Sequence, residues 1–144
     1  EQQQQEFYDT FGDYCDRIFI ENFAPCWPVF DIEERTGFKI TEGIYQQPIT
    51  PTDTCPYIFY SMSVNAGGEV SSCFLDWERK LIIGDTHNQT LEEIWNSKEF
   101  NKLRVQHLEG NRMENPVCSK CGQLSHCLPD NIDPYRKKLL ELFV

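Results

Sequence analysis

Apolar positions in the first part of the chain predict a helix followed by a strand. Phe7 and Phe11 have helical spacing, and Gly12 is well placed to end that helix. Residues 17–23 then form a short run of apolar and β-branched side chains, which is typical of a buried strand. We therefore expect residues 1–27 to fold as one α/β unit.

The centre of the chain predicts a β-hairpin. Residues 57–64 alternate aromatic or aliphatic side chains with others, and residues 69–77 resume as a second strand. The sequence NAGG between these two runs is a turn signal. We expect a third short strand over residues 80–83. The polar, proline-containing residues 28–54 that precede the hairpin indicate an irregular linker.

Helices are predicted after the hairpin. Thr90 and Glu93 have the spacing of a capping box, and Ser97 can cap a second helix. Asp133 followed by Pro134 predicts the start of a C-terminal helix with a packed apolar face. The expected fold class is therefore α+β, in which residues 55–144 form one domain made of a small hairpin followed by helices.

The charge of the chain argues against two classes of partner. Acidic side chains outnumber basic ones by 23 to 13, which gives a formal net charge of -10. Such a balance opposes binding to phosphate backbones or anionic membranes unless the basic residues are concentrated, and the one run of three is at residues 136–138. No stretch approaches the length of a membrane-spanning helix. We expect neither nucleic acid nor membrane as a partner.

The cysteine content indicates a reducing compartment. The chain has seven cysteines, an odd number that fits poorly with a secreted disulfide scaffold. Residues 1–6 lack the positive and apolar regions of an export signal. We therefore expect a cytoplasmic protein. Because the chain starts without methionine and runs straight into a helical pattern, we also expect it to be part of a longer protein.

Four of the cysteines have the spacing of a metal or cluster site. Cys55 and Cys73 form C-x17-C, and after a gap of 44 residues Cys118 and Cys121 form C-x2-C. Thiolates bind soft metals and iron-sulfur clusters, and a C-x2-C pair offers two sulfurs from one tight turn. The predicted hairpin would bring Cys55 and Cys73 near each other. The spacing alone suits Zn²⁺ as well as an iron-sulfur cluster.

Several features around these cysteines occur in a characteristic order. They are Cys55, Gly68-x4-Cys73, KLIIG at residues 80–84, LEEIWNS at residues 91–97, and Cys118-Ser-Lys-Cys121. Together they resemble the SPASM or twitch auxiliary-cluster domain of radical SAM enzymes. The resemblance implies that Cys55, Cys73, Cys118 and Cys121 ligate an auxiliary [4Fe-4S] cluster. It also implies that residues 1–27 are the last α/β unit of a radical SAM partial barrel.

Two departures from the family pattern limit what the resemblance implies. Cys127 continues the pattern of two-cluster SPASM domains, but Asn131 stands where the next cysteine is expected. The one-cluster twitch type is therefore the closer likeness, with Cys127 a spare thiol or a substitute ligand. The chain also lacks a C-x3-C-x2-C motif. We therefore expect S-adenosylmethionine to bind only in a core domain outside this chain, which should not be catalytic alone.

The remaining candidates have ordinary structural explanations. Cys15 and Cys26 are expected to be free thiols that pack as small apolar residues. His126 is a possible ligand, although a solvated or core histidine is more usual. Trp77 is expected to shield the core or the cluster, and Asp76 to be a surface carboxylate, with a substrate-facing role as its alternative.

Two functions from different classes follow. The first is the C-terminal auxiliary [4Fe-4S] domain of a radical SAM enzyme, working with the core domain of the same protein on a peptide, protein or sugar-like small molecule. The cluster would accept an electron from the substrate or anchor it. The alternative is a non-enzymatic module with a structural four-cysteine zinc site, which presents its acidic surface to a partner protein.

Overall fold

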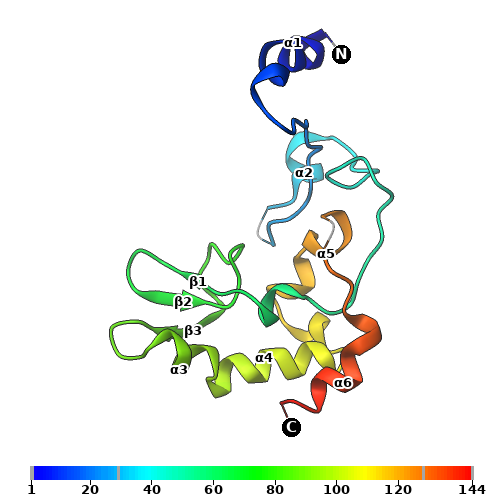
Figure 1. Cartoon of the computed structure of the whole chain (residues 1–144). Coiled ribbons are helices and arrows are strands. Elements are labelled where there is room, and N and C mark those ends of the chain that lie inside the picture. The colour runs from blue at the N-terminus through cyan, green and yellow to red at the C-terminus, as the bar shows by residue number, and fades with distance from the viewer. Residues whose placement is uncertain (1, 29, 128, 144) are drawn as a thin grey trace.

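The computed structural model describes residues 2–28, 30–127 and 129–143 (Figure 1). Its α-helices are α1 (Gln2–Phe11), α2 (Ile32–Thr36), α3 (Leu91–Trp95), α4 (Lys98–Leu108), α5 (Gln123–His126) and α6 (Arg136–Leu140). Its strands are β1 (Ser63–Val64), β2 (Glu69–Ser71) and β3 (Ile82–Asp85). Short 3-10 turns occupy Gly12–Tyr14, Tyr57–Phe59, Arg112–Glu114, Cys118–Lys120 and Asp133–Tyr135. The α+β fold class expected from the sequence is confirmed.

The strands form one small antiparallel sheet in the order β1-β2-β3. The register pairs Ser63 with Ser71, and a bulge after Val70 precedes the pairing of Ser71 with Ile82. The predicted hairpin and third strand are therefore confirmed in order, but the strands are shorter than expected. Residues 57–59 form a 3-10 turn instead of a strand, because Pro56 begins a tight turn in which the N–H of Phe59 donates to its carbonyl.

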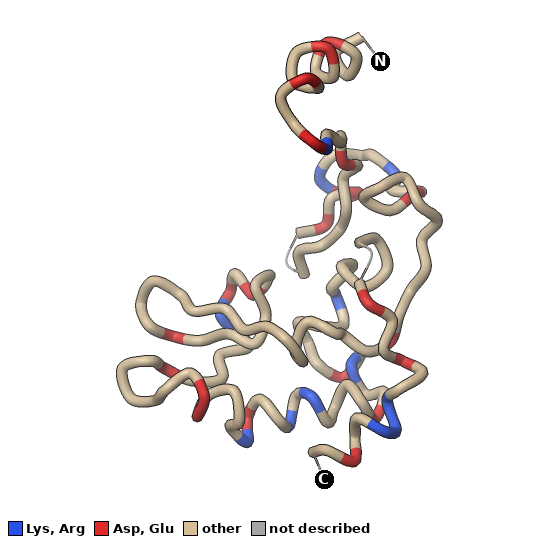
Figure 2. The backbone as a smooth tube through the Cα atoms, in the orientation of Figure 1, with Lys and Arg blue, Asp and Glu red and all other residues tan. Residues whose placement is uncertain are grey.

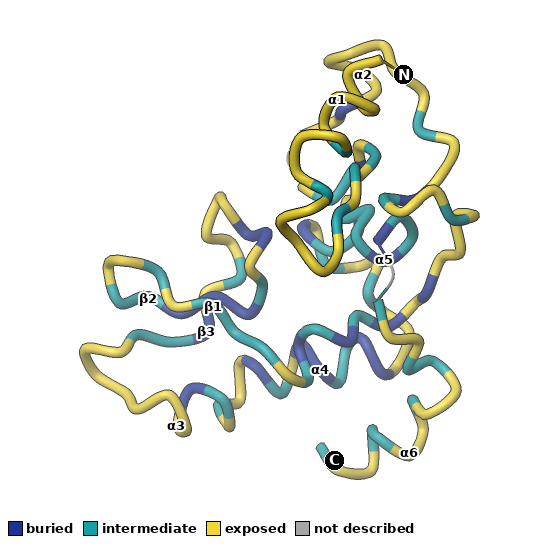
Figure 3. The backbone as a smooth tube through the Cα atoms, turned by 45° about the horizontal axis from the view of Figure 1, so that its top comes forward, coloured by how far each residue is buried: buried dark blue, intermediate teal, exposed yellow. Residues whose placement is uncertain are grey.

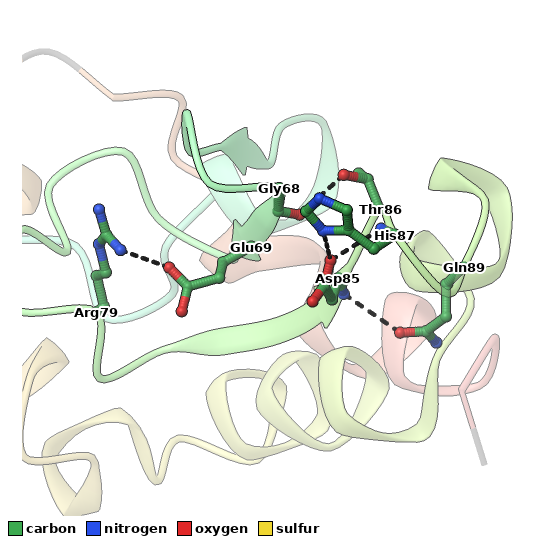
Figure 4. Close-up of polar contacts among 7 residues, drawn as sticks. All are labelled: Gly68, Glu69, Arg79, Asp85, Thr86, His87 and Gln89. Atoms are coloured by element: carbon green, nitrogen blue, oxygen red, sulfur yellow. Dashed lines mark hydrogen bonds and ion pairs between the residues drawn. The ribbon is translucent and has the colours of Figure 1, made fainter.

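Two glycines explain how closely the sheet packs. Gly68 has a φ of +88°, and a Cβ on it would lie 2.4 Å from the His87 ring. The carbonyl of Gly68 accepts from the N–H and the hydroxyl of Thr86, so β2 is fixed to the turn after β3 (Figure 4). A Cβ on Gly84 would lie 2.6 Å from Ile94, so α3 packs directly against β3 at this glycine. Both positions require a residue without a side chain.

The hydrophobic core lies between the sheet, α3 and α4 (Figure 3). Its buried members come from the 3-10 turn, two strands and both helices: Ile58, Val70, Ile83, Ile94, Phe100 and Leu103. The capping box at Thr90 and the cap at Ser97 start the two helices as predicted. Each hydroxyl accepts from a backbone N–H that would otherwise lack a partner.

The N-terminal part of the chain differs from its prediction. Helix α1 is present but buries none of its residues, and it lies apart from the sheet and α4 (Figure 1). The strand expected over residues 17–23 is wrong, since this segment has no ladder partner among the described residues. The N–H of Asn22 donates to the carbonyl of Ile44 at 2.8 Å, which is a loop contact. An apolar run can form a strand only where another strand accepts its backbone hydrogen bonds.

The region predicted as an irregular linker contains a short helix and makes fixed contacts. Asp31 caps α2 and Gly37 ends it in the left-handed conformation. Further along, the N–H of Ile44 donates to the carbonyl of His126 at 2.8 Å, and the Thr52 hydroxyl donates to that of Leu124. This region therefore contacts α5 at Ile44 and Thr52.

Asp133 has a different partner from the one predicted. Its carboxylate accepts from the N–H groups of Asp53 and Thr54, at 2.9 and 2.8 Å, instead of capping its own helix. These bonds outweigh the burial that opposes its charge, so the pKa of Asp133 is lowered. The contact fixes the chain just before Cys55. The apolar face predicted for the C-terminal helix is only partly packed, since Tyr135 and Leu142, on either side of α6, are exposed. No helix in the described ranges has the length and apolar character needed to cross a membrane.

Candidate metal centre

The structure brings the four predicted cysteines to one cavity. Cys55, Cys73, Cys118 and Cys121 all line a space of about 30 Å³ beside α4. Cys55 lies just before the turn Tyr57–Phe59 and Cys73 follows β2, while Cys118 and Cys121 lie at the two ends of the turn Cys118–Lys120. Cys55 and Cys121, which are 66 positions apart in the sequence, therefore line the same cavity.

The backbone around each cysteine is held by specific hydrogen bonds. The side-chain oxygen of Asn115 accepts from the N–H groups of Val117 and Cys118, at 3.0 and 3.1 Å. The N–H of Leu75 points at the sulfur of Cys73 with an N–S distance of 3.4 Å. An N–H directed at sulfur favours the thiolate, which is the form that binds metals.

The cavity wall is mostly apolar, and this sets the protonation of the thiols. Burial raises the pKa of Cys55 and Cys118 to about 12 and that of Cys73 to about 11, and it also raises the pKa of Cys121. The metal-free thiols are therefore protonated at neutral pH. A bound metal stabilises thiolate outright, so loading this site must release protons.

The cysteines surround a volume instead of converging on a point. Within residues 2–28, 30–127 and 129–143, no three Cys, His, Asp or Glu side chains lie close enough to hold one metal ion. A tetrahedral zinc site with Zn–S bonds of about 2.3 Å needs sulfurs only about 3.8 Å apart. A cluster binds each thiolate through a different iron, so its ligands lie farther apart. Four thiols that line one cavity are the type of ligand that an iron-sulfur cluster takes.

Cys127 lies outside this cavity and pairs with another thiol. Its sulfur is 3.4 Å from that of Cys26, which comes from the N-terminal segment. The two thiols titrate together: the hydrogen bond from Cys127 lowers the pKa of Cys26, and the same bond raises the pKa of Cys127. The pair provides a partner for Cys127 that the sequence did not predict.

Replacing Cys127 by serine should leave iron binding unchanged, because its partner is the Cys26 thiol and not the cavity. Serine keeps a hydrogen-bonding group at this position. Iron content and visible absorption after anaerobic reconstitution would be measured for Cys127→Ser, with Cys26→Ser as the matched control. A well-folded Cys127→Ser protein that loses its iron would make Cys127 a ligand.

The other sequence candidates lie elsewhere. Cys15 is a free thiol as expected, but the expectation that it packs as a small apolar residue is wrong, because it is exposed. His126 does not line the cavity, and its Nδ1 is 2.8 Å from the Ser125 hydroxyl. The expectation that Trp77 shields the core is wrong, because its side chain is 70% exposed and packs edge-on against Trp27.

Asp76 has a structural role that sequence reasoning missed. It is buried instead of lying on the surface, and its carboxylate accepts from the Ser71 hydroxyl at 3.0 Å. It also accepts from the N–H groups of Lys80 and Leu81, at 2.9 and 2.6 Å. The Asp76 carboxylate therefore closes the loop between β2 and β3, which carries Cys73.

Replacing Asp76 by alanine should destabilise the protein by about 3 kcal/mol, because three donors lose a charged acceptor in a buried loop. Chemical denaturation would measure the free energy of unfolding. Glu78→Ala is the matched control, since Glu78 makes only an exposed ion pair with Lys80 and should change stability by less than about 1 kcal/mol. Equal stabilities for the two variants would contradict the role of Asp76.

Comparison with known families agrees with the cavity. Residues 55–122 match the SPASM family, described as an iron-sulfur cluster-binding domain. The matched segment begins at Cys55 and ends one residue after Cys121, so it contains the whole four-cysteine set. The resemblance to SPASM domains that the sequence predicts is therefore confirmed for this segment.

Similarity to a curated protein extends the comparison. The chain is 31% identical over 58 residues to the S-adenosyl-L-methionine-dependent 2-deoxy-scyllo-inosamine dehydrogenase of Niallia circulans. The aligned stretch covers 40% of this chain and 23% of that enzyme. The match thus spans about a quarter of the length of this relative. No solved structure gives a significant match.

Proposed function

We propose that this chain is the auxiliary [4Fe-4S] cluster domain of a radical SAM enzyme, with Cys55, Cys73, Cys118 and Cys121 as the ligands. The observation that carries the proposal is the single cavity lined by all four thiols, within the segment that matches the SPASM family. When bound, the cluster would accept an electron from a substrate radical or anchor the substrate.

The cavity supports iron-sulfur over zinc. Its thiols surround a volume and do not approach one another as the ligands of a single ion would, within the part of the chain that the structure describes. Its apolar wall would exclude water, which protects a cluster and helps set its potential. The zinc-binding interaction module remains the alternative, and metal analysis separates the two.

A surface groove adjoins the cavity and is the face that we propose for substrate. It has a volume of about 320 Å³, and its lining includes Trp77, Lys80 and Lys120. Pro28 and Val117 line both the groove and the cysteine cavity. A molecule in the groove would therefore lie against residues that also line the cysteine cavity.

The partners follow from the same proposal. The core domain of a longer protein would hold S-adenosylmethionine and lie against the groove. A small molecule, such as the 2-deoxy-scyllo-inosamine of the relative's name, is the substrate class that we favour over a peptide or protein. Asp and Glu are spread along the chain among Lys and Arg (Figure 2), so we propose no nucleic acid or membrane partner. The free cysteines support a cytoplasmic location.

The sequence encoded upstream of residue 1 tests this function. We expect a partial barrel that carries C-x3-C-x2-C, because that motif holds the cluster that cleaves S-adenosylmethionine in the family. In the full protein, Cys73→Ala should still form 5′-deoxyadenosine but lose the substrate product. An upstream region without the motif, or full product formation by the variant, would contradict the proposal.

A further inference from the structure

Three residues that line the cysteine cavity each have a buried polar atom for which the described structure provides no hydrogen-bond partner. Among the described residues, the hydroxyl of Ser72, Nε2 of His107 and Nε of Arg112 are buried and unpaired. All three residues line the same cavity as the four cysteines. A buried polar atom without a partner destabilises the fold, so three such atoms in residues around one cavity indicate that an acceptor binds there.

A hydrogen bond from Cys55 fixes which nitrogen of His107 is the donor. Its side chain is fully buried, and Nδ1 accepts from the N–H of Cys55 at 3.3 Å. In the neutral ring the hydrogen must then be on Nε2, the unpaired atom. His107 therefore presents an N–H donor.

Ser72 and Arg112 line the cavity and are held in place by other hydrogen bonds. The N–H of Ser72 donates to the carbonyl of Leu81 at 3.0 Å, and the residue precedes Cys73 directly. Nη1 of Arg112 donates to the carbonyl of Cys118. Neither bond uses the Ser72 hydroxyl or Nε of Arg112. The cavity thus combines four sulfur ligands with three donors and no acceptor for them.

We propose that Ser72, His107 and Arg112 donate hydrogen bonds to the sulfur atoms of the bound cluster and thereby raise its reduction potential. The inference rests on the proposed function, because it needs a cluster in the cavity. Hydrogen bonds to cluster and cysteine sulfurs favour the reduced form, which carries one more negative charge. The three residues are positioning and tuning groups and not ligands.

Redox titration of the anaerobically reconstituted protein tests the inference. Ser72→Ala removes one donor. His107→Asn withdraws the donor from the position of Nε2, because the amide is shorter than the ring, while its oxygen can still accept from the N–H of Cys55. Each should keep its iron but shift the reduction equilibrium about tenfold toward the oxidised form, which is about 59 mV for one electron. Thr54→Val is the matched control, since the Thr54 hydroxyl is equally buried and unpaired but does not line the cavity.

The outcomes separate this inference from the proposed function. Wild-type protein that binds no iron would overturn both, whereas iron-loaded variants with the wild-type potential would overturn the donor role alone. If a variant fails to load, pulsed EPR of reduced wild-type protein labelled with ¹⁵N-histidine replaces it. A histidine nitrogen coupled to the cluster supports the inference, because His87 and His126 do not line the cavity. Absence of such coupling contradicts the role of His107.

Discussion

Replacing Cys73 or Cys118 by alanine is expected to abolish the visible absorption of the reconstituted protein and most of its bound iron. Each residue supplies one of the four thiols that line the cavity, from a different element of the fold. Cys73 follows β2 and Cys118 begins the turn Cys118–Lys120. The other described residues that line the cavity include no carboxylate that could replace a lost thiolate.

The matched control for these variants is Cys15→Ala. Cys15 is exposed, and its thiol is 3.0 Å from the carbonyl of Phe11, far along the chain from the cavity residues. Its iron content and absorption should equal those of the wild type. Circular dichroism of each variant shows whether the protein is folded. A folded Cys73→Ala protein with a full complement of iron would refute the ligand assignment.

Replacing Arg104 by alanine is expected to cost about 3 kcal/mol or more of folding free energy. Arg104 is buried in α4 and donates to the carbonyls of Ile58 and Trp95, at 2.9 and 2.8 Å. Its guanidinium also lies over the rings of Phe100 and Trp95, 3.8 and 4.3 Å from their centroids. Truncation would remove these bonds and contacts together and leave a cavity among the aromatic rings.

Replacing Arg104 by lysine separates the effect of its charge from that of its hydrogen-bond geometry. Lys keeps a positive charge but lacks the planar fork that reaches two carbonyls at once, so Arg104→Lys should lose about half as much stability, roughly 1.5 kcal/mol. Lys102→Ala, on the exposed side of the same helix, should change stability by less than about 0.5 kcal/mol. Chemical denaturation under anaerobic conditions measures all three. Wild-type stability for Arg104→Ala would contradict this account of the core.

Local sequence signals predicted the part of the fold around the cysteines. Thr90 and Ser97 form the caps that their positions indicate, and NAGG forms the hairpin turn. These features depend on residues three or four positions apart, so a short window contains all of the information. The four cysteines were predicted from spacing and family resemblance, and the cavity brings them together.

The parts that failed depend on distant partners. Residues 17–23 have the composition of a strand, but their backbone meets a loop at Ile44 and no second strand in the described chain. Asp133 was predicted to cap the helix that follows it, but its carboxylate accepts from the N–H groups of Asp53 and Thr54, about 80 positions away in the sequence. No short window contains such a pair.

Arg104 and His107 are buried polar residues of α4 whose positions in the sequence indicate burial. Arg104 lies four positions after Phe100, so it shares the helix face that was predicted to be apolar. His107 follows Leu103 by the same interval and lines the cysteine cavity. A polar side chain on a predicted core face indicates a buried hydrogen bond. The partners could not be predicted, because the carbonyl of Ile58, which accepts from Arg104, and the N–H of Cys55, which donates to His107, come from elsewhere in the fold.

Metal analysis of the anaerobically reconstituted chain tests the central claim most directly. Iron, acid-labile sulfide and zinc would be measured per chain, together with the EPR spectrum after reduction. Our account predicts iron and sulfide in equal amounts, about four of each per chain, with the EPR signal of a reduced cluster. One zinc per chain with no iron or sulfide, in a colourless and folded protein, would contradict it.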